Sequence, residues 1–506
     1  MTGVEFVKIS PLIFRFSRKI HKYTGLVFFI YFLLMAISGI LINHPNLIRS
    51  LSMPAFMTPD SYKHKQWNRM AIRDAVFSSN YTDTLYVAGR SGVLLSRDNG
   101  RSFCFLDKNF PCSAYDKETY DLLLLENQKL LYAGTRSGLY VCSTKDRAWK
   151  KILLNPRSKE KVVSLAKIKD NVLACTPHAC YFVSIPPQSL VVKKAGLIPE
   201  KGSRASREPL FIFLRKLHNG SILGFSGKLL IDAAAMGLIF LSLSGIYIWF
   251  IPWKIRRGRK RKSGFFRPFR KYHIKTGVYT IVLLMIFALT GILLCRPFIK
   301  TIRPYSVPAQ WLYASTPSRD WPFPISRVLY LEDEDRLILA AAGGFYSGPG
   351  DFSREFVRIP LAVRISGMGV NVFEELTDHR VLIGSFSGLY IWNQKTNKAQ
   401  NFLQSSKRQG MVTASLVKKK HLAAWVDYRK GLQIVDSSLL SLVMPKSLNQ
   451  SNQLSLWYFL FEFHNGRLFK DWLGKYVWII VLSGGIFLLL NSITGFYDWL
   501  YKKIFR

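Results

Sequence analysis

The sequence predicts a four-helix transmembrane bundle that carries an all-β, propeller-like extracytoplasmic domain built from two inserted halves. Three observations predict this mixed fold class. Four apolar segments are long enough to cross a bilayer, which needs about 20 residues. Two long segments between them have the pattern of short antiparallel strands. The whole arrangement then occurs twice along the 506 residues.

The four predicted spans cover residues 23–43, 229–251, 277–295 and 476–500. The first is longer than the apolar stretch of a signal peptide, which is about 7–15 residues, so it is expected to remain as an anchor. The basic run 254–271 joins the second and third spans, and such Lys- and Arg-rich loops lie in the cytoplasm. Both termini are then cytoplasmic, and both long segments lie outside.

The net charge of +40, from 71 Lys and Arg against 31 Asp and Glu, is compatible with nucleic acid or an anionic membrane surface as partner. The basic runs flank the predicted spans, where topology and contact with anionic lipid already account for them. We therefore expect membrane lipid as a partner and no nucleic acid.

The predicted organisation follows the spans. The segments are 1–45 (N-terminus and first span), 46–210 (first half of the β domain), 211–253 (His-Asn-Gly segment and second span), 254–272 (basic cytoplasmic loop), 273–302 (third span), 303–457 (second half of the β domain) and 458–506 (His-Asn-Gly segment, fourth span and cytoplasmic tail).

Internal repetition is the most informative feature of the sequence. Residues 17–45 align without a gap on residues 269–297, and a His-Asn-Gly sequence precedes both the second and the fourth span. The matched positions are His21 with His273, Ser38-Gly39 with Thr290-Gly291, His218 with His464, and Ser244-Gly245 with Thr494-Gly495. Hydrophobicity alone does not produce matched histidines, so the chain contains two copies of one unit.

The outside segments repeat on a shorter period of roughly 35–45 residues, as strand, Gly-containing turn, strand, polar turn and strand, which is typical of propeller blades. Three units in each half predict six blades from both halves, while seven blades or two separate half-domains remain open. The sequence SRDNGRSF resembles the Asp-box of sialidase-type propellers, with Asp98, Gly100 and Phe103 in the expected places. This box stabilises a turn, and no paired-carboxylate or Arg-cluster motif supports sialidase activity.

Five of the six cysteines lie in the outside segments, and Cys295 ends the third span. In an oxidising compartment, Cys104 with Cys112 and Cys175 with Cys180 could pair, which leaves Cys142 over. His178 lies between Cys175 and Cys180, but the spacing favours a buried pair or a disulfide over a metal site.

Five of the nine histidines lie at the ends of spans. His21 and His273 mark the inner ends, and His44, His218 and His464 mark the outer ends. Imidazoles at matched depths on separate helices suit haem iron, which two histidines bind from opposite faces. His21 and His44 are about 35 Å apart along a helix. We expect an inner site of His21 with His273, and an outer site of His44 with His218, His464 or both.

Other polar residues near the spans have a structural explanation beside a functional one. Isolated histidines at an interface are commonly lipid-facing or capping residues. The Ser/Thr-Gly pairs suit close helix packing, although they would also admit a porphyrin. Asp232 and Asp471 lie near the outer ends of the second and fourth spans, where a carboxylate is either functional or placed among lipid headgroups.

The spans resemble the PepSY-associated transmembrane-helix family of bacterial inner-membrane proteins, which includes ferrisiderophore reductases. The matching motifs are Arg-Lys-x-His before the first and third spans, Ser/Thr-Gly-Ile-Leu at their ends, and His-Asn-Gly before the second and fourth. The resemblance implies two b-type haems between the helices, electron transfer to ferric iron chelates, and a periplasmic position for the outside segments. The family usually carries PepSY domains where this chain has propeller-like repeats.

The leading hypothesis is therefore an inner-membrane haem oxidoreductase that reduces ferric chelates in the periplasm. The sequence has no Walker A motif and no dinucleotide-binding GxGxxG, so electrons would come from quinol or from a cytoplasmic reductase. The rival hypothesis is a non-enzymatic, membrane-anchored propeller that recruits periplasmic protein partners as an assembly factor or sensor. A transporter is less favoured, because neither copy contains a broken span.

Overall fold

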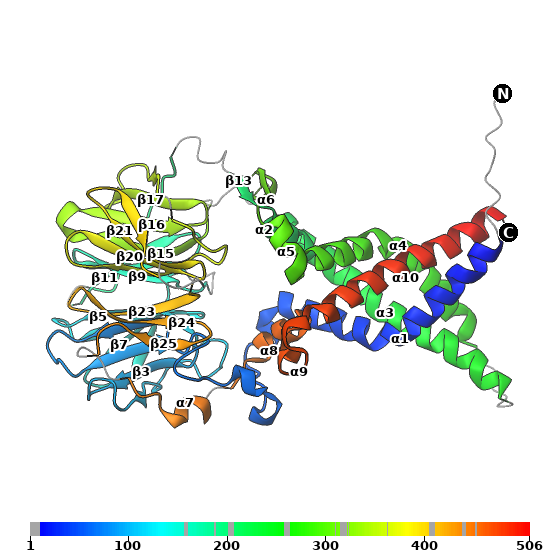
Figure 1. The fold of residues 1–506 in the computed structure, drawn as a ribbon, viewed down its shortest axis with the longest axis horizontal. Helices are drawn as coiled ribbons and strands as arrows, with labels where there is room; N and C mark the ends of the chain where they lie inside the picture. Colours follow the sequence, from blue (N-terminus) through cyan, green and yellow to red (C-terminus); the bar gives the residue numbers. More distant parts are fainter. Residues whose placement is uncertain are drawn as a thin grey trace. The chain divides into compact units, whose positions relative to one another are not determined.

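The computed structural model describes residues 11–155, 160–186, 189–200, 207–257, 264–308, 310–313, 321, 323–361, 363–403, 410–437, 442–450 and 453–505. Two compact units make up the chain. One consists of Met1–Ile48, Arg207–Thr316 and Trp457–Arg506, and the other of Arg49–Ser206 and Pro317–Leu456. The first unit is mainly helical and the second mainly β (Figure 1). Each unit takes segments from both copies of the repeat.

Four long helices form the core of the helical unit: α1 (Pro11–Asn43), α3 (Gly224–Arg256), α4 (Phe266–Leu293) and α10 (Trp478–Phe505). Each contains a window apolar enough to cross a membrane, and each includes most of a predicted span. The basic loop is shorter than predicted, because α3 continues to Arg256 and α4 begins at Phe266. Residues 258–263 of that loop lie outside the described residues.

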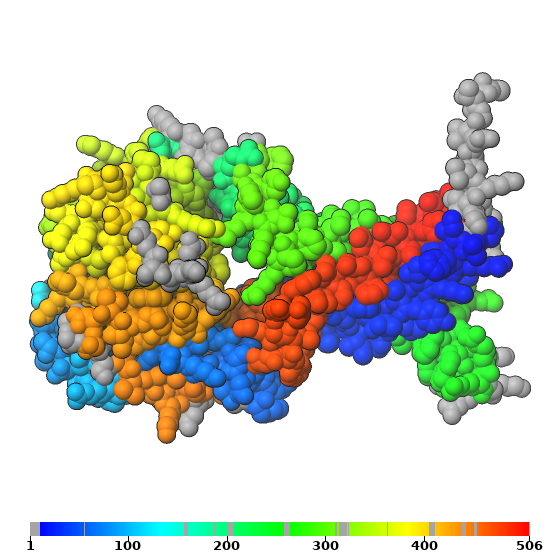
Figure 2. All heavy atoms as spheres, viewed as in Figure 1, coloured from blue at the N-terminus to red at the C-terminus, as the bar shows by residue number. Residues whose placement is uncertain are grey.

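The four helices pack as a bundle in which α1 contacts α3 and α10, and α4 contacts the same two helices. The side-by-side packing of α1 and α10, blue and red, is visible in Figure 2. Small residues allow this close approach. A Cβ atom on Gly484 would lie 2.0 Å from Tyr31, and one on Gly485 would lie 2.7 Å from Ile292.

Shorter elements complete this unit. They are α2 (Leu210–His218), α5 (Arg296–Ile302), α6 (Gln310–Tyr313), α8 (Leu456–His464), α9 (Lys470–Leu473) and the paired strands β13 (Arg207–Pro209) and β14 (Ser306–Pro308). The helices α2 and α8 end on the histidines of the two His-Asn-Gly sequences, where the glycine at each helix end has a positive φ. The chain then turns into α3 and α10.

The β unit consists of antiparallel sheets whose strands follow one another in sequence order. The first three sheets are β1 (Asp74–Phe77), β2 (Leu85–Gly89), β3 (Gly92–Ser96) and β4 (Cys104–Phe105); β5 (Thr119–Leu125), β6 (Leu130–Thr135), β7 (Gly138–Ser143) and β8 (Trp149–Ile152); β9 (Ser164–Ile168), β10 (Asn171–Cys175), β11 (Cys180–Ser184) and β12 (Val192–Lys194).

The second outside segment supplies three further sheets and the helix α7 (Lys446–Gln450). These sheets are β15 (Ile325–Leu331), β16 (Arg336–Ala341), β17 (Gly344–Pro349) and β18 (Val357–Ile359); β19 (Val370–Glu375), β20 (Arg380–Ser385), β21 (Gly388–Asn393) and β22 (Lys398–Asn401); β23 (Val412–Lys418), β24 (His421–Asp427) and β25 (Gly431–Ile434).

The first strands of successive sheets contact one another in a closed circuit, in the order β1, β5, β9, β15, β19, β23 and back to β1. The two outside segments therefore form one unit and not two half-domains. One junction between the segments is closed by a hydrogen bond from Ile325 N to Pro177 O, 2.7 Å long. The other is closed by a bond from Leu432 N to Gln66 O, also 2.7 Å long. The second and third strands of the sheets are the most apolar, and β2 and β3 are buried at every residue. Such continuous apolar runs are typical of strands that are covered on both faces.

The Asp-box forms the turn that its sequence predicts. Asp98 Oδ1 accepts hydrogen bonds from Ser102 N at 2.9 Å and from Ser96 Oγ at 2.7 Å. The bonds from the Ser102 side chain and backbone, and then from Ser96, lower the pKa of Asp98 to about 2. Phe103 packs edge-on against Trp67, with ring centroids 5.1 Å apart. The box therefore acts in local structure, as expected.

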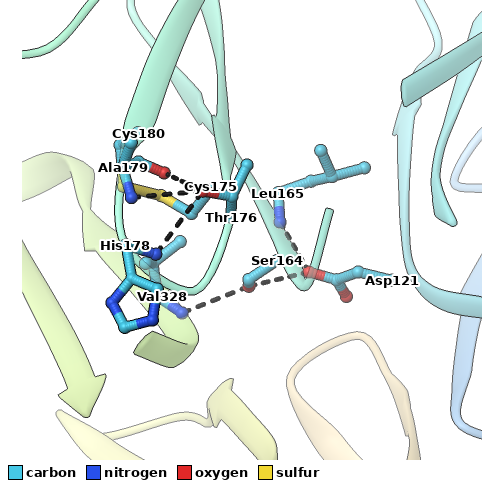
Figure 3. The surroundings of a disulfide bond; sticks show 9 residues. All are labelled: Asp121, Ser164, Leu165, Cys175, Thr176, His178, Ala179, Cys180 and Val328. Atoms are coloured by element: carbon cyan, nitrogen blue, oxygen red, sulfur yellow. Dashed lines mark hydrogen bonds between the residues drawn. A yellow bond between two sulfur atoms is a disulfide. The ribbon is translucent and has the colours of Figure 1, made fainter. Parts of the chain in front are cut away.

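One of the two expected disulfides is present. Cys175 and Cys180 are directly opposite in the β10–β11 hairpin and are bonded, with His178 in the intervening turn (Figure 3). Cys104 and Cys112, the other possible pair, are exposed free thiols. Cys142 is a buried free thiol, which agrees with its being left over.

Charged side chains on the first strands of four sheets form a buried network. Arg327 of β15 lies 2.5 Å from Asp121 of β5 and also donates hydrogen bonds to the backbone carbonyls of Asn371 and Tyr120, both at 2.9 Å. Asp74 of β1 and Glu374 of β19 interact with the same arginine. Burial, followed by the charge of Asp121, raises the pKa of Glu374 to about 7.

We expect substitution Arg327→Leu to destabilise the β unit by about 3–5 kcal/mol, because removing one partner leaves buried carboxylates uncompensated. Urea unfolding of the purified protein measures the change. Arg380→Leu is the matched control, since Arg380 forms an exposed ion pair with Asp378 that is worth no more than about 1 kcal/mol. Equal effects of the two substitutions would contradict the central role of Arg327.

Glu374 gives the β unit a specific pH dependence. With a pKa of about 7 in the folded chain against 4.5 for the ordinary side chain, the folded state binds more protons between these values. Stability must then fall as the pH rises through this window. We expect the wild-type protein to lose roughly 1–3 kcal/mol relative to Glu374→Gln between pH 5 and pH 7.5. Parallel stability curves for the two proteins would contradict this assignment.

Candidate functional site

Four of the five predicted histidines form two pairs within the helical unit. The rings of His21 on α1 and His273 on α4 have centroids 6.4 Å apart. The rings of His218, at the end of α2, and His464, at the end of α8, have centroids 6.2 Å apart. Each pair therefore joins the equivalent histidines of the two sequence repeats.

A hydrogen bond between its Nδ1 atom and an acceptor on another helix fixes each imidazole. The partners are Ser244 Oγ for His273 at 2.8 Å, Thr290 Oγ1 for His218 at 2.7 Å, Ser38 Oγ for His464 at 2.9 Å, and Asn491 O at 3.1 Å with Thr494 Oγ1 at 3.4 Å for His21. In every case the histidine comes from one repeat and its partner from the other. The two repeats thus hold each other's histidines.

The tautomer of each imidazole follows from these bonds. The hydroxyl groups of Ser244, Thr290 and Ser38 donate their own protons to backbone carbonyls three or four residues earlier in the same helix. Each hydroxyl oxygen must therefore accept a proton from the histidine. The Asn491 carbonyl at His21 is an acceptor only, which leads to the same result. Nδ1 thus carries the proton, and Nε2 keeps its lone pair.

The four Ser/Thr-Gly pairs have a second role, because each glycine makes room for an imidazole. A Cβ atom at Gly495 would lie 2.9 Å from His21 Cε1. Corresponding atoms at Gly39, Gly245 and Gly291 would lie 3.4, 3.5 and 3.7 Å from the Cε1 atoms of His464, His273 and His218. The expectation of plain helix packing was therefore incomplete. The hydroxyl orients the ring and the glycine admits it.

This arrangement is chemically suited to a metal ion held between two imidazoles. Two collinear metal–nitrogen bonds of about 2 Å, plus about 1 Å from each nitrogen to its ring centre, place the ring centroids about 6 Å apart. Both observed pairs meet this condition. Histidine ligands also commonly donate the other ring N–H to a neighbouring acceptor, which fixes the tautomer. Among the described residues, none forms a hydrogen bond with Nε2 of these four histidines.

A cavity of about 1030 Å³ surrounds the inner pair and is lined by His21, His273 and residues of all four long helices. Small-molecule sites commonly have volumes of about 300–1,000 Å³, so a cofactor as large as a porphyrin fits. The basic side chains in its lining are Arg15, Arg18, Lys19, Lys22, Arg256, Arg270 and Lys502. Asp498 is the only carboxylate among the described lining residues, so the cavity favours an anionic group.

The remaining candidates lie outside these pairs. His44 Nε2 is 2.6 Å from Asp232 Oδ2, so this nitrogen is engaged by a carboxylate and not directed to the outer pair. Asp232 is buried, and its Oδ1 atom has no hydrogen-bond partner among the described residues. Asp471 is exposed in α9. Arg296, the counterpart of His44, is also exposed.

Comparison with known families accounts for the repeated helices. The PepSY-associated TM region family matches residues 18–502, which is nearly the whole chain. The chain belongs to this family. A comparison with curated proteins finds no match.

Solved structures resemble the chain only weakly. The extracellular domain assigned to a one-component system of B. thetaiotaomicron matches at 10% identity and a TM-score of 0.36, covering 71% of this chain and 32% of that one. An ancestral GH74 enzyme matches at 9% identity and a TM-score of 0.34, covering 74% of this chain and 35% of that one. The dihydro-haem d1 dehydrogenase NirN matches at 8% identity and a TM-score of 0.31, covering 76% of this chain and 56% of that one. The chain spans about a third of the first of these proteins, and similarities this weak carry no conclusion.

The hydroxyl partners are the functional residues that sequence reasoning missed, although the matched Ser/Thr-Gly pairs were the signal. We expect Ser244→Ala and Thr290→Val to weaken haem retention at the inner and outer pairs by about 10–100-fold, because outer hydrogen bonds of this kind orient a metal ligand. Haem titration into the apoprotein measures the loss. Ser483→Ala is the matched control, since Ser483 Oγ donates to Ile480 O of its own helix and Ser483 is not among the described lining residues of the cavity. An equal loss in this control would contradict the assigned role.

Proposed function

We infer that this membrane protein is a haem-dependent electron-transfer protein that reduces ferric iron chelates outside the membrane. Its inner haem would be bound by His21 and His273, and its outer haem by His218 and His464. The observation that carries the proposal is the pairing of four histidines at a spacing and in a tautomer that would suit a metal ion held between two imidazoles. Membership of the PepSY-associated TM region family supports it.

When bound, haem supplies one-electron chemistry, with a potential that depends on its axial ligands and their hydrogen bonds. The chain's own residues perform the other tasks. The Nδ1–H groups bond to the hydroxyl and carbonyl acceptors, which raises the basicity of the imidazoles and fixes their ring planes. The basic lining of the inner cavity, including Arg18 and Arg270, would pair with carboxylates on the cofactor. Apolar side chains such as Phe28 and Phe487 pack between the helices and exclude water.

The two pairs suit transfer across the membrane because they are well separated in depth. His21 and Ser38, which holds His464, are 17 residues apart on α1, or about 25 Å along a helix. The distribution of Lys and Arg supports a cytoplasmic position for both termini in a bacterial inner membrane. The inner pair would then receive electrons from quinol or a cytoplasmic reductase, and the outer pair would deliver them to the periplasm.

The closed circuit of six sheets supports a six-bladed propeller for the β unit. Such a domain would serve as the extracytoplasmic docking surface for the electron acceptor. The alternative function, a propeller that recruits protein partners without redox chemistry, is compatible with the same β unit. This alternative does not require the hydroxyl and carbonyl acceptors that fix the tautomers of the four paired histidines.

Visible spectra of the detergent-purified protein, oxidised and reduced with dithionite, test the proposal together with pyridine-haemochrome quantitation. We expect about two b-type haems per chain, one held by each pair of histidines. His21→Ala and His218→Ala should each lose one haem.

His44→Ala is the matched control, because His44 is bound to Asp232 outside both pairs, and it should retain both haems. A colourless wild-type protein from haem-replete cells, or full haem content in both pair variants, would overturn the proposal.

A further inference from the structure

The β unit contains a compact cluster of cationic side chains around a single carboxylate. Arg73 and Arg136 both form ion pairs with Glu118, whose side chain is 9% exposed. Arg136 Nε donates a hydrogen bond to Glu118 Oε2 at 2.7 Å. Arg90 acts on the same carboxylate. Three guanidinium groups therefore share one negative charge.

Tyrosine rings stack against the cations. The guanidinium carbon of Arg73 lies 4.5 Å from the ring centroid of Tyr120, and that of Arg136 lies 4.6 Å from that of Tyr115. The ammonium group of Lys161 lies 5.5 Å from the Tyr120 centroid. Aromatic faces stabilise cations without neutralising them. The cluster, defined as Arg73, Arg90, Arg136, Lys161 and Glu118 with the two tyrosines, therefore retains a positive charge.

The repeat architecture brings these residues to one end of the first three sheets. In an antiparallel meander, the start of the first strand and the turn between the second and third strands lie at the same end. Arg73, Glu118 and Lys161 precede β1, β5 and β9, and Arg90 and Arg136 occupy the turns β2–β3 and β6–β7. Hydrogen bonds from Arg73 N to Ala88 O at 2.7 Å and from Arg136 N to Glu118 O at 2.9 Å join these positions.

The cluster is not a general consequence of the repeat. The corresponding turns of the fourth and fifth sheets are Ala342-Gly343 and Phe386-Ser387, and Pro324 and Gly369 precede the first strands there. None of these residues is charged. Because the shared strands fold without cations at these positions, folding does not require them in the first three sheets. The turn β24–β25 of the sixth sheet, which adjoins the first sheet, also carries the cations Arg429 and Lys430. The positive charge is therefore concentrated on the sheets around β1, and a ligand would explain this concentration.

The electrostatics of the cluster indicate the charge of that ligand. Burial would raise the pKa of Glu118, but Arg136, Arg73 and Arg90 together hold it well below its ordinary value. The carboxylate therefore stays ionised. Arg73 Nε is buried without a hydrogen-bond partner among the described residues. An unsatisfied buried donor is costly, and an anion with several oxygen atoms would accept this hydrogen bond and pair with the guanidinium groups around it.

We propose that this cluster binds a multivalent oxyanion, with carboxylate or phosphate oxygens paired to the guanidinium groups of Arg73, Arg90 and Arg136. A polycarboxylate iron chelate has this chemistry, so the site would hold the substrate of the proposed reductase; to that extent the inference rests on the proposed function. Binding itself requires neither haem nor electron transfer.

Isothermal titration calorimetry of the full chain in detergent tests the site, with citrate, ferric citrate and inorganic phosphate as probes. We expect binding that Arg90→Gln and Lys161→Gln each weaken about tenfold or more, as loss of a charge-assisted contact requires. Lys161 is exposed, so its substitution spares the fold. Arg101→Gln is the matched control, because Arg101 is an exposed arginine of the same unit outside the cluster.

The three probes distinguish the source of the oxyanion. Tighter binding of ferric citrate or citrate than of phosphate identifies a polycarboxylate, and the reverse order identifies a phosphate-bearing ligand. Failure of all three probes to bind, or equal binding by wild type, Arg90→Gln and Lys161→Gln, would overturn the site. Since calorimetry does not depend on colour, a haem-free protein that binds an oxyanion would refute the reductase and leave this site intact.

Discussion

The hydrogen bond between a histidine Nδ1 and an acceptor on the opposite repeat is the constraint on which the helical unit depends. An imidazole can be a metal ligand through Nε2 only while its other nitrogen carries the proton. Here the acceptors are hydroxyl groups whose own protons are already donated within a helix, or a carbonyl that has none to give. Because each bond crosses between repeats, separation of the repeats would remove both the orientation and the tautomer.

The duplicated features and the unique features of the chain have different roles. Both repeats supply the paired histidines, their acceptors and their glycines, so the helical unit is nearly symmetric where a cofactor would be bound. The symmetry fails at two places. His44, which contacts Asp232, has the exposed Arg296 as its counterpart in the second repeat. The other place is the cationic cluster of the first three sheets. A substrate lacks the twofold symmetry of a duplicated protein. Its contacts, unlike those of the cofactor, are therefore expected where the repeats differ.

Much of this organisation could be predicted from the sequence because it depends on local patterns. Hydrophobic length gave the four spans, and the matched positions of His21 and His273 indicated a shared site. The placement of His44 was not predictable, because its partner Asp232 is 188 residues away and nothing local indicates their contact. The sequence left open whether Cys104 and Cys112 pair, because the geometry of the chain and not the spacing of the residues decides whether two thiols meet. The cluster around Glu118 was missed for a similar reason, since its members belong to different turns.

The cationic cluster and the buried network of Arg327 are coupled through adjacent residues of the same strands. Arg327 donates hydrogen bonds to the backbone carbonyls of Arg73, at 3.3 Å, and Tyr120, at 2.9 Å. The side chains of these two residues belong to the cluster, whereas the next residues, Asp74 and Asp121, belong to the network. Neighbouring side chains on a strand point to opposite faces, so one short segment serves both. The network is rich in carboxylates and the cluster in guanidinium groups. An anion bound to the cluster would therefore restrain the backbone segments whose carbonyls accept hydrogen bonds from Arg327. Occupancy of the site would in this way stabilise the centre of the β unit.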